Sequence, residues 1–298
     1  MNSFDINTYL KEKKNIIDRA LDTLLPQKDV SPPQLHNAMR YVIFSGGKRL
    51  RPILAMAAAE AVGGNSETLV KEACALELLH TYTLVHDDLP SMDDDDYRRG
   101  SLTTHKVFGE AVAVLTGDAL QTEAFRILSD MENSGFSPDK KLKLIQLISM
   151  ACGSRGVIGG QIVDLESEGK TISREQLEYI HLHKTAALIT ASVLTGAILA
   201  DADRPTLDLL NDYGEAIGLA FQITDDILDE TGSTEELGKP AGSDRDLKKA
   251  TYPALIGLAE SEKIKQALYQ KALEAVSGFD LRARPLREIA KRIIERKN

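Results

Sequence analysis

The chain has 298 residues, of which 43% are hydrophobic and 27% are charged, and its net charge is −9. This length suffices for a large core in one big domain or two small ones, and the acidic balance argues against general nucleic-acid binding. Aromatic residues make up only 5% of the chain while Ala, Leu, Ile, Glu and Lys abound, so we expect helices rather than sheets.

Neither the cysteines nor the amino terminus point to secretion or to a membrane. Cys74 and Cys152 form no metal-ligand pattern and no disulfide framework, which is typical of core residues in a cytosolic protein. The first residues, MNSFDINTYLKEKK, are too polar for a signal peptide. The most apolar window, Ala186 to Ala200, is too short and too rich in Thr, Ser and Gly to span a membrane, so it is predicted to be a buried helix. The expected location is cytoplasmic.

Apolar residues at helical spacing, separated by Pro and Gly, predict helices along the whole chain. In the first half these cover Ile6–Leu25, Pro33–Phe44, Pro52–Val62, Glu67–Asp88, Thr104–Met131 and Pro138–Cys152. In the second half they cover Gln161–Glu168, Arg174–Leu199 with a break, Pro205–Leu228, Tyr252–Ser277 and Pro285–Arg296, with a polar, mobile loop over Gly232–Asp246. Because no alternating strand pattern, repeat or linker is present, we predict one all-α domain over residues 1–298.

Six aspartates lie within ten residues of the stretch VHDDLPSMDDDDYRRGS, which begins at Val85. They are Asp87, Asp88 and Asp93–Asp96, and the next charged residues are Arg98 and Arg99. Carboxylates this close repel one another unless a cation neutralises them, and magnesium is held by carboxylates together with phosphate oxygens. Guanidinium groups match the same phosphate oxygens. The stretch therefore indicates a magnesium and diphosphate site, although a solvated acidic loop has a similar composition.

A second acidic cluster, FQITDDILD, ends at Asp229 within a predicted apolar helix. Asp225 and Asp229 are four residues apart and share a helix face, which Gln222 joins, and Asp226 lies beside them. Carboxylates this close on a mostly buried helix are unfavourable without a cation. We therefore expect the two clusters to face each other across one cavity.

The segment GGKRLRP, which begins at Gly46, has the features of an anion-binding turn. Glycines let the backbone approach a ligand, and Pro52 suits the first turn of a helix, whose start attracts anions. Lys48 and Arg51 then supply charge for a phosphate. Three basic residues on a solvated turn would give the same pattern.

One helical histidine lies in register with the first acidic cluster. His80 is seven residues before Asp87, two turns away on the same face, whereas His86 faces away from that stripe. A lone helical histidine is also common as a core or surface group. Farther along, Lys184 precedes an apolar run, which is an odd place for an unpaired charge and favours a buried anion.

The two acidic motifs resemble the aspartate-rich motifs of the trans-isoprenyl diphosphate synthases, with most similarity to the bacterial short-chain group. The resemblance covers nearly the whole chain, because GGKRLRP, LLHTYTLVHDD, GGQIVD and HKT occur in the family's order. It implies an all-α domain of antiparallel helices around a deep central cavity. It also implies a homodimer whose partners are isopentenyl diphosphate and the allylic dimethylallyl and geranyl diphosphates.

The resemblance assigns roles to residues in each motif. It implies about three magnesium ions per site, held by Asp87, Asp93 and Asp225, with the bend at Pro90 bringing Asp93 back beside Asp87. Lys48, Arg51, His80 and Arg99 would bind isopentenyl diphosphate, and Arg98, Lys184 and Lys239 the allylic diphosphate. Thr185 and Gln222 would lie beside the developing cation. The supporting residues are Asp88, Gln161, Asp164, Asp226, Asp229 and Asp244, whereas Asp94–Asp96 are expected to be exposed.

These roles imply a prenyl transfer in which the allylic diphosphate ionises, the double bond of isopentenyl diphosphate attacks, and a proton is lost to the departing diphosphate. In the family a bulky residue five positions before the first aspartate stops growth at fifteen carbons, so Tyr82, with Thr83 beside it, argues for farnesyl diphosphate. A geranylgeranyl or geranyl diphosphate synthase, a terpene cyclase and a non-catalytic regulatory or metal-binding subunit remain alternatives. The terminal Arg296 and Lys297 fit either a cap on the isopentenyl site or a frayed end.

Overall fold

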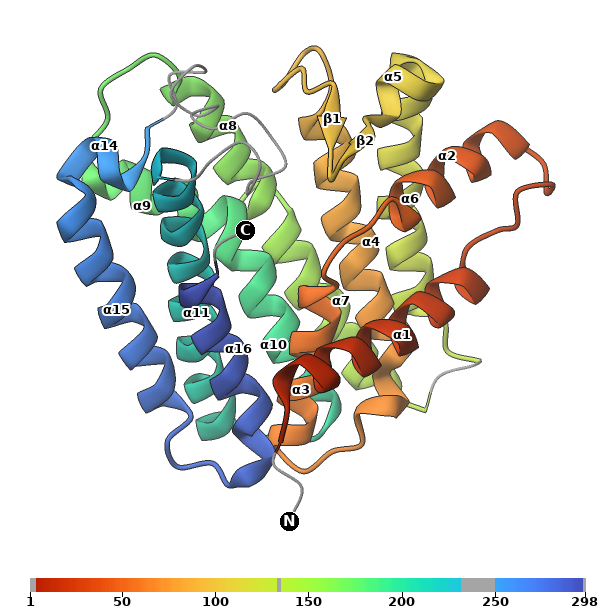
Figure 1. The fold of residues 1–298 in the computed structure, drawn as a ribbon. Coiled ribbons are helices and arrows are strands. Elements are labelled where there is room, and N and C mark those ends of the chain that lie inside the picture. The colour runs from red at the N-terminus through yellow and green to blue at the C-terminus, as the bar shows by residue number, and fades with distance from the viewer. Residues whose placement is uncertain (1–3, 133–134, 232–249, 297–298) are drawn as a thin grey trace. The chain divides into compact units, whose positions relative to one another are not determined.

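The computed structural model describes residues 4–132, 135–231 and 250–296, and nearly all of the regular structure in them is helical (Figure 1). The prediction of an all-α fold is confirmed. The chain divides into two compact units, which we call unit 1 (Met1–Met56 and Glu67–Ile145) and unit 2 (Ala57–Ser66 and Gln146–Asn298). The predictions of one domain over residues 1–298 and of a central cavity stay predictions.

Unit 1 is built around one mostly buried helix, α4 (Val70–Asp87). Its elements are α1 (Ile6–Leu24), α2 (Pro33–Phe44), the start of α3 (Leu50–Ala61), α4 (Val70–Asp87), the hairpin β1 (Tyr97–Arg98) and β2 (Ser101–Leu102), α5 (Thr104–Phe108), α6 (Glu110–Ser129) and the start of α7 (Pro138–Cys152). Helix α4 packs along α6 and also contacts α1 and α2. Leu76, Leu78 and Leu79 of α4 are fully buried, so this helix forms the core that positions the first acidic motif at its end.

Unit 2 is organised around the long helix that carries the second acidic motif. Its elements are α8 (Val157–Ser167), α9 (Arg174–Ile180), the π-helical segment η2 (His181–Ala186), α10 (Ala187–Leu199), α11 (Arg204–Thr231), α14 (Tyr252–Ile256), α15 (Leu258–Ala275) and α16 (Arg284–Glu295). Short 3-10 turns, η1 (Ser66–Leu69) and η3 (Leu281–Ala283), precede α4 and α16. Helix α11 packs against α10, α15 and η2.

Several predicted boundaries differ from the structure for local reasons. The predicted helix Thr104–Met131 is interrupted at Gly109, whose φ of 86° lies in the left-handed region, and Gly257 at φ 82° divides Tyr252–Ser277 in the same way. Helix α8 begins at Val157, four residues before the predicted start. The sequence pattern did not indicate one short hairpin, in which Tyr97–Arg98 pairs with Ser101–Leu102.

The apolar stretch of unit 2 is mostly buried. By length and composition alone, Arg174–Leu199 would suffice to cross a membrane, but 61% of its most apolar window is buried in the structure. The core helix of a soluble protein has the same properties. Cys74 and Cys152 are both buried and neither forms a disulfide, as the sequence predicted.

Candidate active site

The turn between α2 and α3 has an unusual backbone. Gly46 and Gly47 adopt φ values of 120° and 119°, and Arg49 adopts 53°, which is uncommon for a residue with a side chain. This conformation leaves Lys48 exposed on the turn and Arg51 half-buried in the first turn of α3. The two basic side chains predicted to bind a diphosphate thus flank a buried Arg49.

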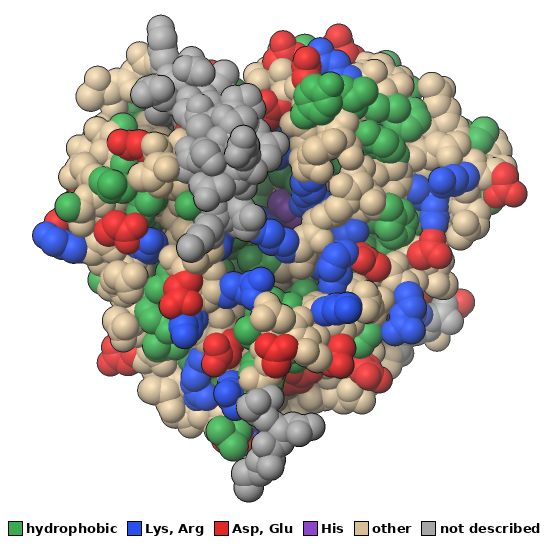
Figure 2. Space-filling model, viewed as in Figure 1, with side chains coloured by type: hydrophobic (Ala, Val, Ile, Leu, Met, Phe, Trp, Pro, Cys, Tyr) green, Lys and Arg blue, Asp and Glu red, His purple; other side chains and the backbone are tan. Residues whose placement is uncertain are grey.

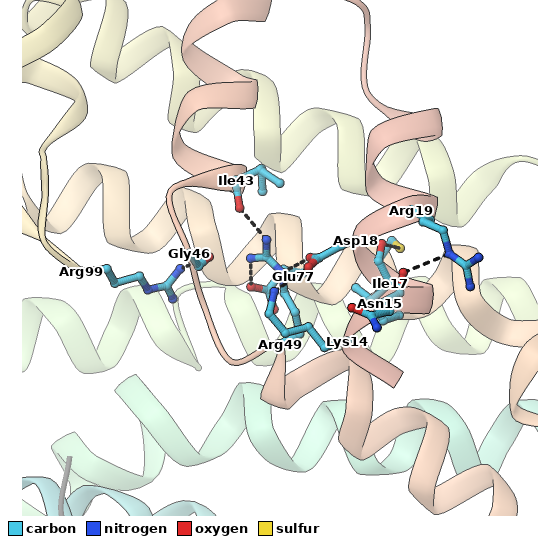
Figure 3. A network of polar contacts seen from close by, with 11 residues as sticks. Lys14, Asn15, Ile17, Asp18, Arg19, Ile43, Gly46, Arg49, Glu77 and Arg99 are labelled. Carbon is cyan, nitrogen blue, oxygen red and sulfur yellow. Dashed lines mark hydrogen bonds and ion pairs between the residues drawn. The ribbon is translucent and has the colours of Figure 1, made fainter. Parts of the chain in front are cut away.

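Arg49, to which the sequence assigned no role, holds this turn in place (Figure 3). Its Nε donates to Asp18 Oδ1 (2.7 Å) and its Nη1 to Glu77 Oε1 (2.9 Å), while Nη2 donates to the Ile43 carbonyl (2.6 Å). The Arg49 and Glu77 side chains are only 1% and 2% exposed. Burial opposes its charge, but Glu77 and Asp18 outweigh burial and raise the pKa of Arg49. The network therefore ties the turn to α1, α2 and α4.

His80 lies amid positive charge, as its predicted role requires. Burial lowers the pKa of His80 well below its ordinary value, and Arg51, Arg99 and Arg98 lower it further. Arg99 reaches back to the turn, where its Nη1 donates to the Gly46 carbonyl (3.1 Å). Neutral His80 and these guanidinium groups form a site suited to a highly charged anion. The structure thus brings together His80, Arg51 and Arg99, which the sequence had grouped.

The first acidic motif turns back on itself where α4 ends. The Asp93 backbone N–H donates to the Asp87 carbonyl (2.9 Å), and the Asp94 N–H donates to the Leu89 carbonyl (3.1 Å). The prediction that the chain bends at Pro90 and returns Asp93 to the side of Asp87 is confirmed. Two partly exposed carboxylates therefore begin from neighbouring points of the backbone.

Asp88 supports Arg98 and is buried, at 2% exposure. The Arg98 Nε donates to Asp88 Oδ1 at 2.5 Å, and Arg98 also contacts Asp95 at 3.4 Å. Burial raises the pKa of Asp88 to about 6, although Arg98 acts in the opposite direction. The Asp94 and Asp96 side chains are 62% and 60% exposed, as expected.

The carboxylates of these motifs suit magnesium rather than a metal held by a closed protein cage. Among the described residues, no three His, Cys, Asp or Glu side chains converge as a ready-made metal site. Magnesium usually retains several waters and is bound through one or two carboxylates together with substrate phosphates. The adjacent Asp87 and Asp93 fit that mode.

Tyr82 is a buried residue of α4 that packs beside His86. Tyr82 is 4% exposed, and its ring meets the His86 ring edge-on at 5.9 Å. His86 Nε2 lies 3.0 Å from the Val114 carbonyl of α6, so His86 faces away from the His80 side, as predicted. A Cβ at Gly117 of α6 would collide with the His86 ring, so this glycine permits the close packing of α4 and α6. The Thr83 hydroxyl donates to the His80 carbonyl (2.8 Å).

Lys184 lies on the π-helical segment η2 and has a carboxylate partner. Its Nζ donates to Asp164 Oδ2 (2.6 Å), so the anion beside Lys184 in this structure is a carboxylate of the chain itself. A Cβ at Gly160 would collide with the backbone of Lys184, so the glycine lets α8 approach η2 and brings Asp164 within reach. Asp164 was predicted as a supporting residue, and Gln161 lies partly exposed on the same helix.

The second acidic motif is divided by burial. Asp226 and Asp229 are 2% and 6% exposed, whereas the Asp225 side chain is 43% exposed. Gln222 donates to Asp226, four residues later, and Thr185 donates to Gln222 Oε1 (2.9 Å). Thr185 and Gln222, which were predicted to act together, are therefore in direct contact.

Arg296, which follows α16, lies against the second acidic motif. Its guanidinium pairs with Asp225, donates to the Phe221 carbonyl (3.2 Å), and lies 4.0 Å from the centre of the Phe221 ring. A frayed end is therefore wrong for Arg296. The predicted roles of Lys239, Asp244 and Lys297 lie outside the described residues.

Sequence reasoning missed residues whose partners are distant in the chain. Arg49 pairs with Asp18 and Glu77, and His181 contacts Asp226 at 2.9 Å. The sequence pointed to Arg49 and His181 only through their places in the chain. Arg49 lies within GGKRLRP and His181 lies just before HKT, and both motifs had been identified for other residues.

Comparison with known proteins agrees with this geometry. A family model described as polyprenyl synthetase matches residues 32–279. A heterodimeric geranylgeranyl pyrophosphate synthase large subunit from Arabidopsis thaliana is 44% identical over 99% of this chain and 81% of its own. A geranylgeranyl diphosphate synthase from Cyanophora paradoxa is 43% identical, over 99% and 98% respectively. The crystal structure of an FPP/GFPP synthase from Zymomonas mobilis superposes with a TM-score of 0.86 at 37% identity, over 97% and 98%.

Proposed function

The chain belongs to the polyprenyl synthetase family of prenyltransferases, and on that premise we propose that it makes farnesyl diphosphate. The reaction adds isopentenyl diphosphate to dimethylallyl and then to geranyl diphosphate. The observation that supports transfer to isopentenyl diphosphate is the cationic cluster at the Gly46–Arg51 turn. Burial is the largest cause of the lowered pKa of His80, and the charge of this cluster lowers it further.

In this proposal, unit 1 binds isopentenyl diphosphate. Lys48, Arg51 and Arg99 neutralise its diphosphate, and His80 remains uncharged and donates a hydrogen bond. Arg49 makes no contact with substrate and instead keeps the turn in its left-handed conformation through Asp18 and Glu77. The homoallylic double bond is held by its diphosphate end, which leaves it free to attack.

The allylic diphosphate is assigned to Arg98 and Lys184, with Lys239 as a further group. Asp88 orients the Arg98 guanidinium, and Asp164 orients the Lys184 ammonium, so both cations are in place before substrate binds. Thr185 and Gln222 supply oxygen atoms beside the carbon that becomes positive. These residues favour ionisation because their charges and dipoles are fixed in advance.

Asp87, Asp93 and Asp225 are assigned to about three magnesium ions, which the carboxylate chemistry suits. When bound, magnesium supplies charge that stabilises the departing diphosphate. Arg296 lies on Asp225 in this structure and neutralises it.

Tyr82 supports farnesyl diphosphate as the product. Its ring is 4% exposed and lies about one helical turn before Asp87, where it limits the space for a growing chain. The relatives named above as geranylgeranyl synthases make the twenty-carbon product the second candidate. Product chain length separates the two.

We also propose that two copies of the chain associate through unit 1. Large apolar side chains are exposed on the hairpin, α5 and α6 (Figure 2). They are Tyr97 at 63%, Leu102 at 42%, Val107 at 43%, Val114 at 41% and Leu115 at 56%. Exposed apolar patches of this kind are typical of interaction surfaces.

The proposed activity is tested by consumption of isopentenyl diphosphate in the presence of an allylic diphosphate. We expect consumption that stops when a chelator removes divalent ions and returns when magnesium is added. A terpene cyclase would consume the allylic diphosphate alone. A regulatory or structural subunit would consume neither substrate, and either result would contradict the proposal.

A further inference from the structure

The Thr185 hydroxyl begins a chain of hydrogen bonds through the interior of unit 2. It donates to Gln222 Oε1 (2.9 Å), and Gln222 Nε2 donates to Asp226 Oδ1 (3.2 Å). The other carboxylate oxygen, Asp226 Oδ2, accepts from His181 Nε2 (2.9 Å) and from the Tyr252 backbone N–H (3.0 Å). Asp226 is 2% exposed, so the chain of bonds ends on a buried carboxylate with three donors.

The carboxylate sets the direction of every bond in this chain. A carboxylate only accepts hydrogen bonds, so Gln222 must turn its amide nitrogen toward Asp226. The amide oxygen of Gln222 then faces Thr185 and requires a donor. The hydrogen of the Thr185 hydroxyl is consequently directed at Gln222, and the remaining surface of that oxygen consists of lone pairs.

Thr185 differs from three other hydroxyl residues in the neighbouring helices α10 and α11. Ser192, Thr195 and Thr224 each donate to the carbonyl four residues earlier in their own helix. Thr185 lies in the π-helical segment and donates across to α11 instead. Such π-helical insertions occur frequently at functional sites.

We propose that Asp226, held by His181, is a positioning residue that keeps the lone pairs of the Thr185 hydroxyl directed toward the substrate. The inference rests on the proposed function, in which Thr185 lies beside the cation formed by the allylic substrate. A hydroxyl that presents only lone pairs stabilises a neighbouring positive charge, whereas one that presents its hydrogen opposes it.

Asp226→Asn reverses this direction while preserving size. The new carbonyl oxygen still accepts from His181 and Tyr252, so the new amide nitrogen faces Gln222. Gln222 then turns its oxygen toward that nitrogen and its own nitrogen toward Thr185. The Thr185 oxygen becomes an acceptor, and its hydrogen is released toward the substrate.

A double-mutant cycle tests the coupling between Asp226 and Thr185. With isopentenyl and geranyl diphosphate, Asp226→Asn is expected to lower kcat roughly 10- to 100-fold, with little change in KM for geranyl diphosphate. In a Thr185→Val background, which lacks the hydroxyl, Asp226→Asn should have almost no further effect on kcat. Effects that multiply in the double variant would show that Asp226 acts independently of Thr185 and would overturn the inference.

A charge-exchanged variant provides the matched control. Gln222→Glu combined with Asp226→Asn has the same net charge as the wild type, and the new carboxylate at position 222 again accepts the Thr185 hydrogen. Its kcat should exceed that of Asp226→Asn alone, and equal or lower kcat in a folded variant would overturn the inference. A wild-type chain that consumes no isopentenyl diphosphate would overturn the proposed function itself. If the wild type is active and the effects of Asp226→Asn and Thr185→Val on kcat multiply, only this inference is overturned.

Discussion

Tyr82 is the residue on which the expected product depends. It is buried at 4% exposure, and its ring contacts His86, which in turn lies against α6. Gly117 lets α6 pack closely against His86, and the Tyr82 ring in turn packs against the His86 ring. In the proposed function, this buried ring is the group that limits chain growth.

Tyr82→Ala should therefore lengthen the product from fifteen toward twenty carbons, because the alanine leaves space where the ring had been. The matched control is Tyr82→Phe, which keeps the ring and should keep the fifteen-carbon product. Chromatography of the dephosphorylated products measures both. Unchanged product lengths in Tyr82→Ala would remove Tyr82 from its assigned role.

The sequence identified residues whose chemistry is local and missed those defined by distant partners. The bend that returns Asp93 to Asp87 was predictable from Pro90 within the same motif. The pairing of Lys184 with Asp164 was missed because Asp164 lies twenty residues earlier on α8, and only the close packing at Gly160 brings it near. Arg49 was passed over because its partners, Asp18 and Glu77, come from two other helices.

At the scale of elements, the α2–α3 turn is held by one buried charge network. Arg49 adopts a left-handed φ of 53° that would ordinarily be disfavoured, and its three hydrogen bonds stabilise this conformation. Glu77 is 2% exposed and forms a buried ion pair with Arg49. The turn that presents Lys48 and Arg51 is thus fixed from within unit 1.

Arg49→Met should lower the free energy of unfolding by about 3–5 kcal/mol, because it leaves Glu77 buried without its cation. The control is Lys14→Met, which removes the partly exposed ion pair with Asp18 and should cost at most about 1 kcal/mol. Urea denaturation of the two variants gives the comparison. Equal, small losses in both would show that the buried pair contributes no more than a surface one.

The order and limits of most helices followed from the sequence, and the exceptions have identifiable causes. Helices α1, α2 and α7 agree with prediction to within a residue, since Pro marks their starts or ends. The breaks at Gly109 and Gly257 depend on glycines that adopt left-handed conformations, which a helical pattern alone does not reveal. The π-helical segment at His181–Ala186 was foreseen only as a break, because its form depends on packing against α8 and α11.

At the scale of the whole molecule, the proposed dimer is assigned to the exposed apolar side chains on unit 1. Leu115→Glu places a charge in the proposed interface and should shift the protein from dimer toward monomer in light scattering. Val30→Glu, at a side chain that is 49% exposed on the loop before α2, should leave the dimer intact. A wild-type protein that is monomeric at micromolar concentration would refute this interface.

The most direct measurement of the central claim is the product formed from geranyl and isopentenyl diphosphates with magnesium. We predict one condensation that gives (2E,6E)-farnesyl diphosphate, with little further extension when isopentenyl diphosphate is in excess. Geranyl diphosphate recovered unchanged, with no isopentenyl diphosphate consumed, would contradict the account, and a predominantly twenty-carbon product would contradict its assignment of chain length.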